Sequence, residues 1–344
     1  MLTPPAPVAL YFVASPLQYL AAKRVAAQFE QGGRQILIWY KQGVGAVVQE
    51  KDWDLAFYMP WPRWEPLPGP FGRHRRLRKN LQEVAQHLGR CQEIHLHSAV
   101  FDTEAINYFL RGLPKLTGAK TLVARILPDG LLSVRRYPLG PLKQAMQYMR
   151  KLRRIVAPEL DYWCFSGDRI GSEAPFCDRI YTLAGLPHDY PKEKVVVLPP
   201  LVDVKPAAKD QTFKKALVIG QPLTDTGLLS LEDCQTVTEQ IHLWLASQNI
   251  QHIEYKAHPK DPKRELFVQG DQPLDLTVPL EVWMSQTHYD AVVGVRSSAL
   301  IFARQIYPHS TLVAAFGWHK IQFKSKEEAQ DMRQAFEATG VIIQ

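Results

Sequence analysis

A lysine and a histidine two residues apart, Lys256 and His258, follow a short apolar run that begins at Ile253 and carry side chains that can neutralise a phosphate. Pro259 comes next. A run that ends in polar residues is typical of a buried parallel strand, whose last residues reach one edge of the sheet. Ligands of open α/β sheets bind at that edge. A His-Pro pair alone more often marks a turn.

Two hydroxyl residues follow a second apolar run, residues 291–295, and precede an expected helix over residues 298–306. Ser297 can cap this helix, and Ser298 lies in its first turn. The free N–H groups at a helix start can hold an anion. Together with the lysine and histidine of the first run, they predict a phosphate site.

Two further polar turns follow apolar runs in the first half of the chain. Asp129-Gly130 follows the expected strand 121–127, and Ser15 follows the expected strand 8–14. A carboxylate after a strand can accept a proton from a reacting hydroxyl, although Asp-Gly is also a common turn pair. Asp129 is therefore the candidate general base.

The order of these four motifs resembles that of bacterial sialyltransferases of the lipooligosaccharide sialyltransferase and polysialyltransferase type. The resemblance implies an α/β fold of the GT-B class, with two Rossmann-like domains facing each other across a cleft. It also implies an inverting glycosyltransferase that moves sialic acid or a related sugar acid from a CMP-sugar to a glycan or glycolipid. Pro128 stands where many family members have a second acid.

The same resemblance assigns roles to individual residues. Asp129 and His258 would be catalytic, with the histidine acting on the leaving phosphate. Glu281 would bind the ribose hydroxyls, and Gly220 and Gln221 would line the cytidine pocket. The full set of expected substrate-binding residues is Lys256, Pro259, Glu281, Ser297, Ser298, Gly220, Gln221, Ser15 and Gly130. We expect no metal and no cofactor, because these side chains can neutralise a monophosphate diester.

Length and composition agree with two globular domains. The chain has 344 residues, 46% of them hydrophobic and 22% charged. The stretch 183–212 is rich in proline and lysine, so we expect a first domain over 1–200 and a second over 213–344, whose last helix packs on the first. The strand, helix, strand order of residues 8–39 predicts a Rossmann-like unit. A dinucleotide is not expected there, because the first turn lacks Gly-x-Gly-x-x-Gly.

Two basic helices suggest contact with an anionic surface. Arginines are concentrated at 73–79, and the helix 143–154 has an apolar face bordered by lysine and arginine. The alternatives are a solvated cationic face and docking on anionic membrane lipids. The net charge of +7 does not demand nucleic acid as a partner.

Four cysteines without Cys-x-x-Cys spacing favour a reducing cytoplasm, at the inner face of the membrane if the basic helices dock there. The first residues lack the features of a signal peptide, and no apolar stretch reaches eighteen residues.

Two further pairs of residues could have either a structural or a functional role. His95 and His97 point to the same face of a strand, as a metal pair or as hydrogen-bonded histidines, and the second is favoured because a third ligand is not evident. Trp61 and Trp64, in a proline-rich loop, either pack on the core or stack on an acceptor sugar.

Two other functions remain open from the sequence. The same fold transfers other sugars, such as Kdo or glucose, and the chain could instead be a non-catalytic module that binds lipid or nucleic acid through its basic helices.

Overall fold

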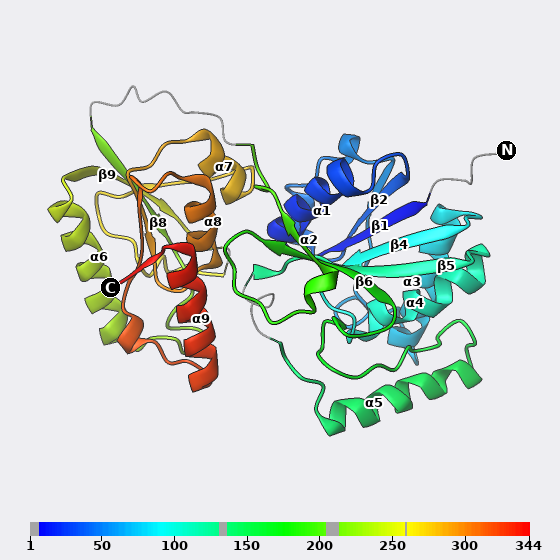
Figure 1. The fold of residues 1–344 in the computed structure, drawn as a ribbon. Coiled ribbons are helices and arrows are strands. Elements are labelled where there is room, and N and C mark those ends of the chain that lie inside the picture. The colour runs from blue at the N-terminus through cyan, green and yellow to red at the C-terminus, as the bar shows by residue number, and fades with distance from the viewer. Residues whose placement is uncertain (1–6, 131–135, 204–212, 259) are drawn as a thin grey trace. The chain divides into compact units, whose positions relative to one another are not determined.

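The chain folds into two compact α/β units. The structure, a computed structural model, describes residues 7–130, 136–203, 213–258 and 260–344. The first unit comprises Met1–Leu183 with His188–Leu201, and the second comprises Ala184–Pro187 with Val202–Gln344. Each unit has one parallel sheet with helices between its strands, so the predicted α/β class is confirmed (Figure 1).

The first sheet has seven strands in the order β3-β2-β1-β4-β5-β6-β7, and every neighbouring pair is parallel. Its strands are β1 Val8–Val13, β2 Arg34–Trp39, β3 Leu55–Tyr58, β4 Glu93–Ser98, β5 Thr121–Ile126, β6 Cys177–Leu183 and β7 Val195–Leu198. The main helices of this unit are α1 Pro16–Phe29, α2 Gln42–Gly45, α3 Gly72–Leu88, α4 Glu104–Thr117 and α5 Pro141–Lys151.

One face of the first sheet is apolar. Leu10, Phe12 and Leu96 are fully buried there in one cluster with Leu81 of α3 and Phe109 of α4. Alternation along each strand sends the intervening side chains to the other face. That second face is partly polar, which is unusual for a sheet buried on both sides.

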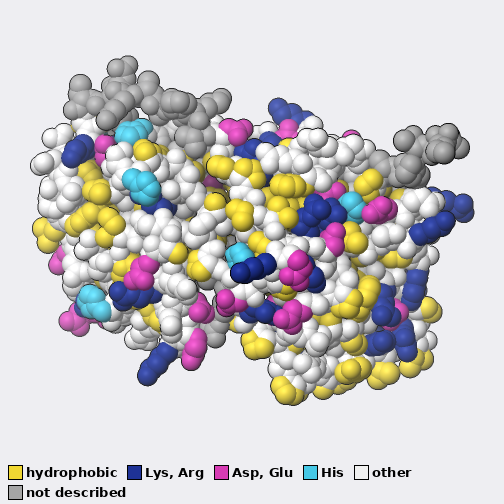
Figure 2. All heavy atoms as spheres, viewed as in Figure 1, with side chains coloured by type: hydrophobic (Ala, Val, Ile, Leu, Met, Phe, Trp, Pro, Cys, Tyr) yellow, Lys and Arg dark blue, Asp and Glu magenta, His cyan; other side chains and the backbone are white. Residues whose placement is uncertain are grey.

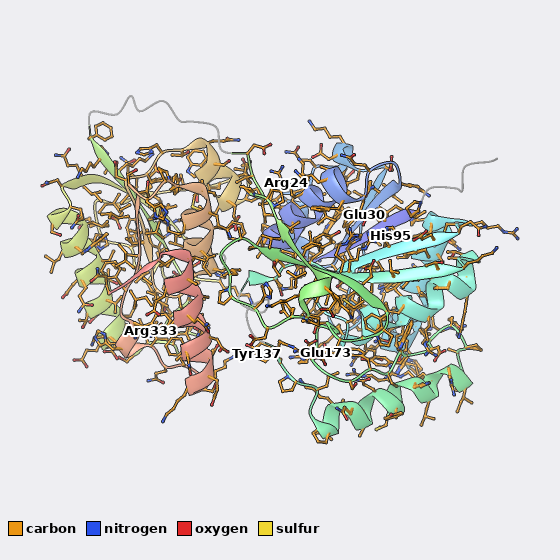
Figure 3. The ribbon with its side chains drawn as sticks, in the orientation of Figure 1. Arg24, Glu30, His95, Tyr137, Glu173 and Arg333 are labelled. Atoms are coloured by element: carbon orange, nitrogen blue, oxygen red, sulfur yellow. The ribbon has the colours of Figure 1, made fainter. Side chains whose placement is uncertain are left out.

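A buried ionic network occupies the second face. Glu30, which caps the C-terminus of α1, accepts from Arg125 of β5 and lies 2.6 Å from Nδ1 of His95 of β4 (Figure 3). His97 is completely buried, stacks on Tyr11 with ring centroids 4.4 Å apart, and has its pKa lowered to about 3, chiefly by burial. Both histidines are thus hydrogen-bonded parts of the core.

The second sheet has six parallel strands in the order β10-β9-β8-β11-β12-β13. Its strands are β8 Lys214–Ile219, β9 Ile250–Lys256, β10 Gln272–Pro273, β11 Ala291–Gly294, β12 Leu312–Ala315 and β13 Ile342–Ile343. Its helices are α6 Leu231–Ser247, α7 Leu280–Gln286, α8 Ser298–Ile306 and α9 Lys326–Thr339. The last helix packs within this unit, with Phe336 buried against Trp318 at a ring separation of 5.8 Å.

Two central elements of the first unit, α4 and β6, were not predicted from the sequence. Helix α4 contains Gly112 and Pro114, which resemble helix breakers, yet Pro114 lies near the helix end and the preceding turns present a continuous buried face. Strand β6 was overlooked because charged Asp178 and Arg179 interrupt its apolar residues. Arg125 of β5 pairs with that Asp178 at 3.1 Å, so the interruption is part of the ionic network.

No helix among the described residues is long and apolar enough to cross a membrane.

We expect Glu30→Gln to lower the free energy of unfolding by about 3 kcal/mol, because it leaves buried Arg125 and His95 without their shared carboxylate. Urea denaturation measures this change. The control is Glu50→Gln, an exposed carboxylate that should change stability by less than about 0.5 kcal/mol. Equal stability of the two variants would contradict a structural role for the network.

Candidate active site

The candidate base lies in the turn after β5. Asp129 is half-buried, and its pKa is raised by burial, opposed by a hydrogen bond from Gln18 and by the charge of Lys41. Gly130 has a φ of 53°, in the left-handed region that favours glycine. The Asp-Gly pair is therefore a real turn, and it holds a carboxylate whose pKa is shifted towards neutral pH.

The turn after β1 holds the partner of this acid. Ser15 caps α1 by accepting from the Gln18 backbone N–H at 3.2 Å, and Pro16 begins the helix as predicted. The Gln18 side chain is almost fully buried, and its Oε1 accepts from the Ala14 N–H at 2.7 Å. Its amide nitrogen is thereby directed to Asp129, so the two motifs of the first unit meet at one sheet edge.

In the second unit, hydrogen bonds tie together the turns after three neighbouring strands. Gly220 N–H, after β8, donates to the Lys256 carbonyl at the end of β9 at 2.9 Å. Gln221 Oε1 accepts from the Arg296 N–H, after β11, at 2.8 Å. The expected residues Gly220, Gln221 and Lys256 thus lie at one edge, next to the turn that contains Ser297.

Only glycine fits at position 220. A Cβ there would overlap the hydroxyl of Tyr255 and approach the Lys256 carbonyl to 3.1 Å. Tyr255 is fully buried and donates to Asp261 at 3.1 Å, so it cannot readily move. The glycine is required for close approach of two backbones.

His258 is the exposed residue of the turn after β9. Its Nδ1 accepts from the Lys260 N–H at 3.1 Å, so the proton of the neutral ring is on Nε2. Partial burial and the charges of Lys260 and Lys256 lower its pKa, and Asp261 opposes them. The lowered pKa favours the neutral ring at pH 7, and its Nε2–H can donate to a phosphate.

Two acids that we did not anticipate, buried Asp261 and half-buried Glu265, shape this turn. Asp261 N–H donates to the His258 carbonyl at 2.9 Å, while the carboxylate accepts from Tyr255 and from the Glu265 N–H. Glu265 in turn accepts from the Leu223 N–H at 2.6 Å, which joins the turn after β8. An acid three residues after the histidine of a His-Pro pair was the available sequence signal for Asp261.

The turn after β11 presents a helix start. Ser297 caps α8 by accepting from the Ala299 N–H at 3.3 Å, and Ser298 is its first residue. Arg296 pairs with Glu328 at 3.0 Å and is held on α9. The side chain of Lys256 makes no hydrogen bond or ion pair with any residue that the structure describes. Its positive charge is therefore available to a ligand.

The geometry suits one phosphate group. Strands β9 and β11 flank β8, so their ends lie about 10 Å apart. Side chains of His258 and Ser297 can reach a common anion across that distance, above the backbone N–H groups of α8. The strand order reverses between β8 and β11, and such switch points are where α/β sheets bind ligands.

The two remaining expected substrate-binding residues of the second unit are Glu281 and Pro259. Glu281 lies in the first turn of α7, half-buried, and burial raises its pKa. Such a carboxyl gains from two hydroxyl donors. Pro259 lies outside the described residues.

Among the described residues, no group of three or more His, Cys, Asp or Glu side chains could hold a metal ion.

Residues 192–315 match the family model of alpha-2,8-polysialyltransferases. The matched segment contains all the described candidate residues of the second unit: Gly220, Gln221, Lys256, His258, Glu281, Ser297 and Ser298. No curated protein sequence matches the chain.

Solved structures of similar fold cover almost all of the chain. The glycosyltransferase SnogD from Streptomyces nogalater has a TM-score of 0.53 at 14% identity, covering 98% of this chain and 87% of its own. The spinosyn rhamnosyltransferase SpnG has a TM-score of 0.51 at 13% identity, with coverages of 98% and 86%. A UDP-GlcNAc 2-epimerase from Methanocaldococcus jannaschii has a TM-score of 0.50 at 9% identity, with coverages of 97% and 92%. At these identities the similarity shows the fold alone, and it confirms the predicted GT-B class.

Proposed function

We propose that this chain, which has the GT-B fold and matches the polysialyltransferase family model over residues 192–315, is a glycosyltransferase that transfers a sialic acid or related sugar acid from a CMP-sugar to a glycan or glycolipid. The observation that carries the proposal is the joining of three turns in the second unit. Hydrogen bonds hold Gly220, Gln221 and Lys256 at the edge where α8 begins.

The leaving group in this reaction is CMP. Its phosphate gains negative charge as the bond from the anomeric carbon to the phosphate oxygen breaks. Nε2–H of His258, the charge of Lys256 and the start of α8 stabilise that charge. A neutral imidazole suffices, because the phosphate leaves as an anion and needs a hydrogen-bond donor.

The nucleoside is held by neighbouring groups. Glu281 accepts from the ribose hydroxyls, and its raised pKa falls when they bind. Gln221 uses its carbonyl oxygen on Arg296, so its amide N–H groups are directed to the base. Gly220 fixes the turn that carries Gln221, through its backbone hydrogen bond to Lys256.

The acceptor hydroxyl attacks the anomeric carbon and gives its proton to Asp129. Burial raises the pKa of this carboxyl, and a base with a pKa closer to the working pH is a better catalyst. A single displacement of this kind inverts the anomeric centre. We propose that it needs neither a metal nor a cofactor.

The same fold accommodates other donors, including Kdo and glucose nucleotides, and the sialic acid assignment is the more specific part of the proposal. The preferred donor nucleotide distinguishes a sialic acid transferase from a Kdo or glucose transferase. The presence or absence of transfer product distinguishes an enzyme from a purely binding module.

We expect CMP, but not UDP, GDP or ADP, to raise the melting temperature, because a ligand that binds only the folded state stabilises it by about 2.7 kcal/mol at a hundredfold excess over Kd. His258→Ala should weaken CMP binding about tenfold, as hydrogen bonds to charged groups contribute about 1.5–3 kcal/mol. CMP-sialic acid should yield transfer product in the presence of EDTA.

The control is His309→Ala, an exposed histidine before β12 at the opposite edge of the sheet, which should leave CMP binding unchanged. Preference for UDP or GDP would replace the donor assignment. Binding of CMP without any transfer would favour a module that is no longer catalytic.

The acidic limb of the pH profile tests Asp129. Because the base must be ionised and its pKa is raised, kcat/KM should fall as pH drops, at a higher pH than the ordinary aspartate value of about 3.9. Lys41→Met removes a charge that lowers this pKa and should move the limb to still higher pH. Asp129→Asn should lower the rate about 10²–10⁴-fold.

Lys120→Met provides the matched control, because Lys120 is also exposed but precedes β5, at the strand end opposite Asp129. If both lysine variants share one profile, Asp129 is not the titrating base.

We also propose that α5 docks the enzyme on an anionic membrane. The helix is inverted relative to an ordinary surface helix, since its one buried residue is Gln147 and its apolar side chains face outward. Leu142 and Met149 of α5 are 76% and 70% exposed, and Ile155, in the short 3-10 helix Leu152–Ile155 that continues α5, is 76% exposed. Figure 2 shows hydrophobic side chains along the edge where α5 lies. An apolar patch of this kind marks an interaction surface.

The basic residues beside the exposed apolar face of α5 favour an anionic partner for it. Residues 136–158 contain six lysines and arginines and no acid. A second copy would bring these like charges together, whereas anionic headgroups complement them. Arginines of both basic segments form ion pairs, as Arg78 with Glu159 at 2.6 Å and Arg136 with Asp168 at 3.0 Å. We choose α5 as the docking surface because exposed Leu142 and Met149 add apolar area beside its basic residues.

We expect the wild-type protein to float with vesicles that contain phosphatidylglycerol but not with neutral vesicles, and Met149→Ser/Ile155→Ser to lose this binding, because it removes buried apolar area from the membrane contact. Leu231→Ser/Leu243→Ser is the control, since these α6 side chains are 69% and 71% exposed. Equal flotation of both double variants would contradict docking through α5.

A further inference from the structure

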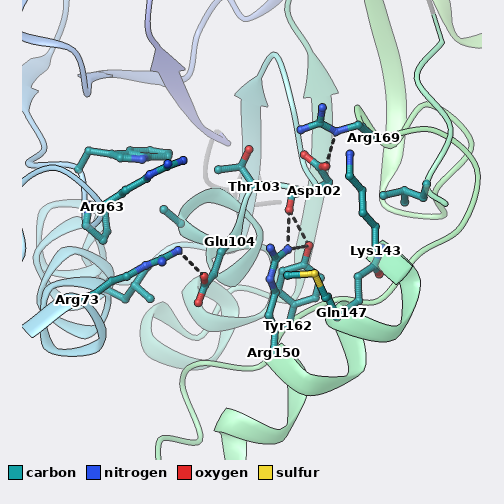
Figure 4. Close-up of a pocket in the computed structure, with 16 residues that line it drawn as sticks. Arg63, Arg73, Asp102, Thr103, Glu104, Lys143, Gln147, Arg150, Tyr162 and Arg169 are labelled. Carbon is teal, nitrogen blue, oxygen red and sulfur yellow. Dashed lines mark hydrogen bonds and ion pairs between the residues drawn. The ribbon is translucent and has the colours of Figure 1, made fainter. Parts of the chain in front are cut away.

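A cationic pocket in the first unit has no role in the chemistry described above. It has a volume of about 270 Å³ and is lined by residues of α3, α4 and α5 and of the loops that contain Trp61 and Arg169 (Figure 4). Typical sites for drug-sized ligands measure about 300–1,000 Å³, so this pocket suits one smaller group, such as a single sugar unit.

The charges of the lining leave a positive excess. The basic residues are Arg63, Arg73, Lys143, Arg150 and Arg169, and the acidic ones are Asp102 and Glu104. Glu104 is neutralised by Arg73 at 2.9 Å and Asp102 by Arg169 at 2.6 Å. Arg63, Lys143 and Arg150 make no ion pair with any residue in the described ranges, although Arg150 donates to the Asp102 carbonyl at 3.1 Å and to the Tyr162 hydroxyl at 3.3 Å. An anion entering the pocket therefore meets three cations without a carboxylate partner, of which Arg63 and Lys143 also have no hydrogen-bond partner among the described residues.

Two buried polar atoms in the lining also lack partners. Gln147 is 2% exposed, and its Oε1 accepts from the Phe165 N–H at 2.8 Å, but its Nε2 has no hydrogen-bond partner. Asp102 is 8% exposed, and its Oδ1 is likewise unsatisfied. Unpaired buried polar atoms are costly, which points to a ligand that supplies both an oxygen acceptor and a hydroxyl donor.

Two stacked aromatic side chains connect the pocket to the candidate base, Asp129. Trp61 forms one wall and stacks on Tyr40 with ring centroids 4.3 Å apart. Tyr40 in turn lies close enough to Asp129 for that carboxylate to raise its pKa, after the larger effect of burial. The rings of Trp61 and Tyr40 thus lie between a group bound in the pocket and the Asp129 carboxylate.

We propose that this pocket is an acceptor subsite for an anionic sugar unit, one that bears a carboxylate or a phosphate beside its hydroxyls. The inference rests on the proposed transferase function and specifies its acceptor. Arg63 and Lys143 bind the charged group, the Gln147 amide donates to one of its oxygens, and Asp102 accepts from a sugar hydroxyl. Trp61 and Tyr162 supply apolar surface for the ring.

Equilibrium binding tests the subsite without turnover. The probes are methyl glucuronide, methyl glucoside 6-phosphate and neutral methyl glucoside, measured by ligand-observed NMR on the full chain. The two anions should bind at least tenfold more tightly than the neutral sugar, with an advantage that shrinks as salt rises. The ratio between the carboxylate and the phosphate identifies which anion the pocket prefers.

Arg63→Gln/Lys143→Gln should abolish this advantage. Neither side chain makes a hydrogen bond or ion pair with the residues that the structure describes, so the variant should remain folded. Gln147→Glu keeps the acceptor for Phe165 but replaces the donor by a charge, and it should exclude the anions. Lys51→Gln, an exposed lysine outside the pocket, is the matched control and should bind as the wild type does.

The outcomes separate the subsite from the transferase proposal. Loss of anion binding in the double variant with CMP affinity unchanged supports the subsite, even if the donor assignment fails. Equal binding of the neutral and anionic sugars, undiminished binding in the double variant, or no binding of any probe would overturn it.

Discussion

The proposed phosphate site of the second unit depends on how closely the ends of β8 and β9 approach each other. Gly220 reaches the Lys256 carbonyl with its N–H because it has no side chain, and the fully buried Tyr255 occupies the space that any Cβ would need. Tyr255 is fixed by Asp261, which also holds the backbone of His258. One close contact between backbones therefore sets the position of the imidazole.

Both units use the same architectural rule for different chemistry. Parallel strands bring the ends of distant segments to one edge, so Ser15, Gln18 and Asp129 meet in the first unit although more than a hundred residues separate them. Glu30 and Arg125 hold α1 against the middle of that sheet through buried charges, where most parallel sheets use apolar packing. The position of α1 fixes the turn that contains Ser15.

Much of this arrangement was predictable from the sequence, since an apolar run that ends in a polar turn specifies a strand and its edge together. Strands, caps and the order of the motifs were accessible in this way. The protonation of His258 was not, because it depends on Lys260 and Asp261 in a turn with no repeating pattern. The pocket could not be predicted either, because its lining combines segments far apart in the sequence, and only the folded structure shows which of their charges are paired and which are not. Helix α4 was missed because Pro114 is a breaker in general but is harmless at the end of a helix.

The inverted orientation of α5 makes its two faces interdependent. Gln147 and Arg150 extend from the inner face into the pocket, while Leu142 and Met149 extend outward. A rotation of the helix that inserts more of the outer face into a membrane also moves the pocket side chains of the inner face. The two proposals are therefore coupled: a ligand that fixes the inner face should raise the affinity for the lipid surface by the same factor as the surface raises the affinity for the ligand.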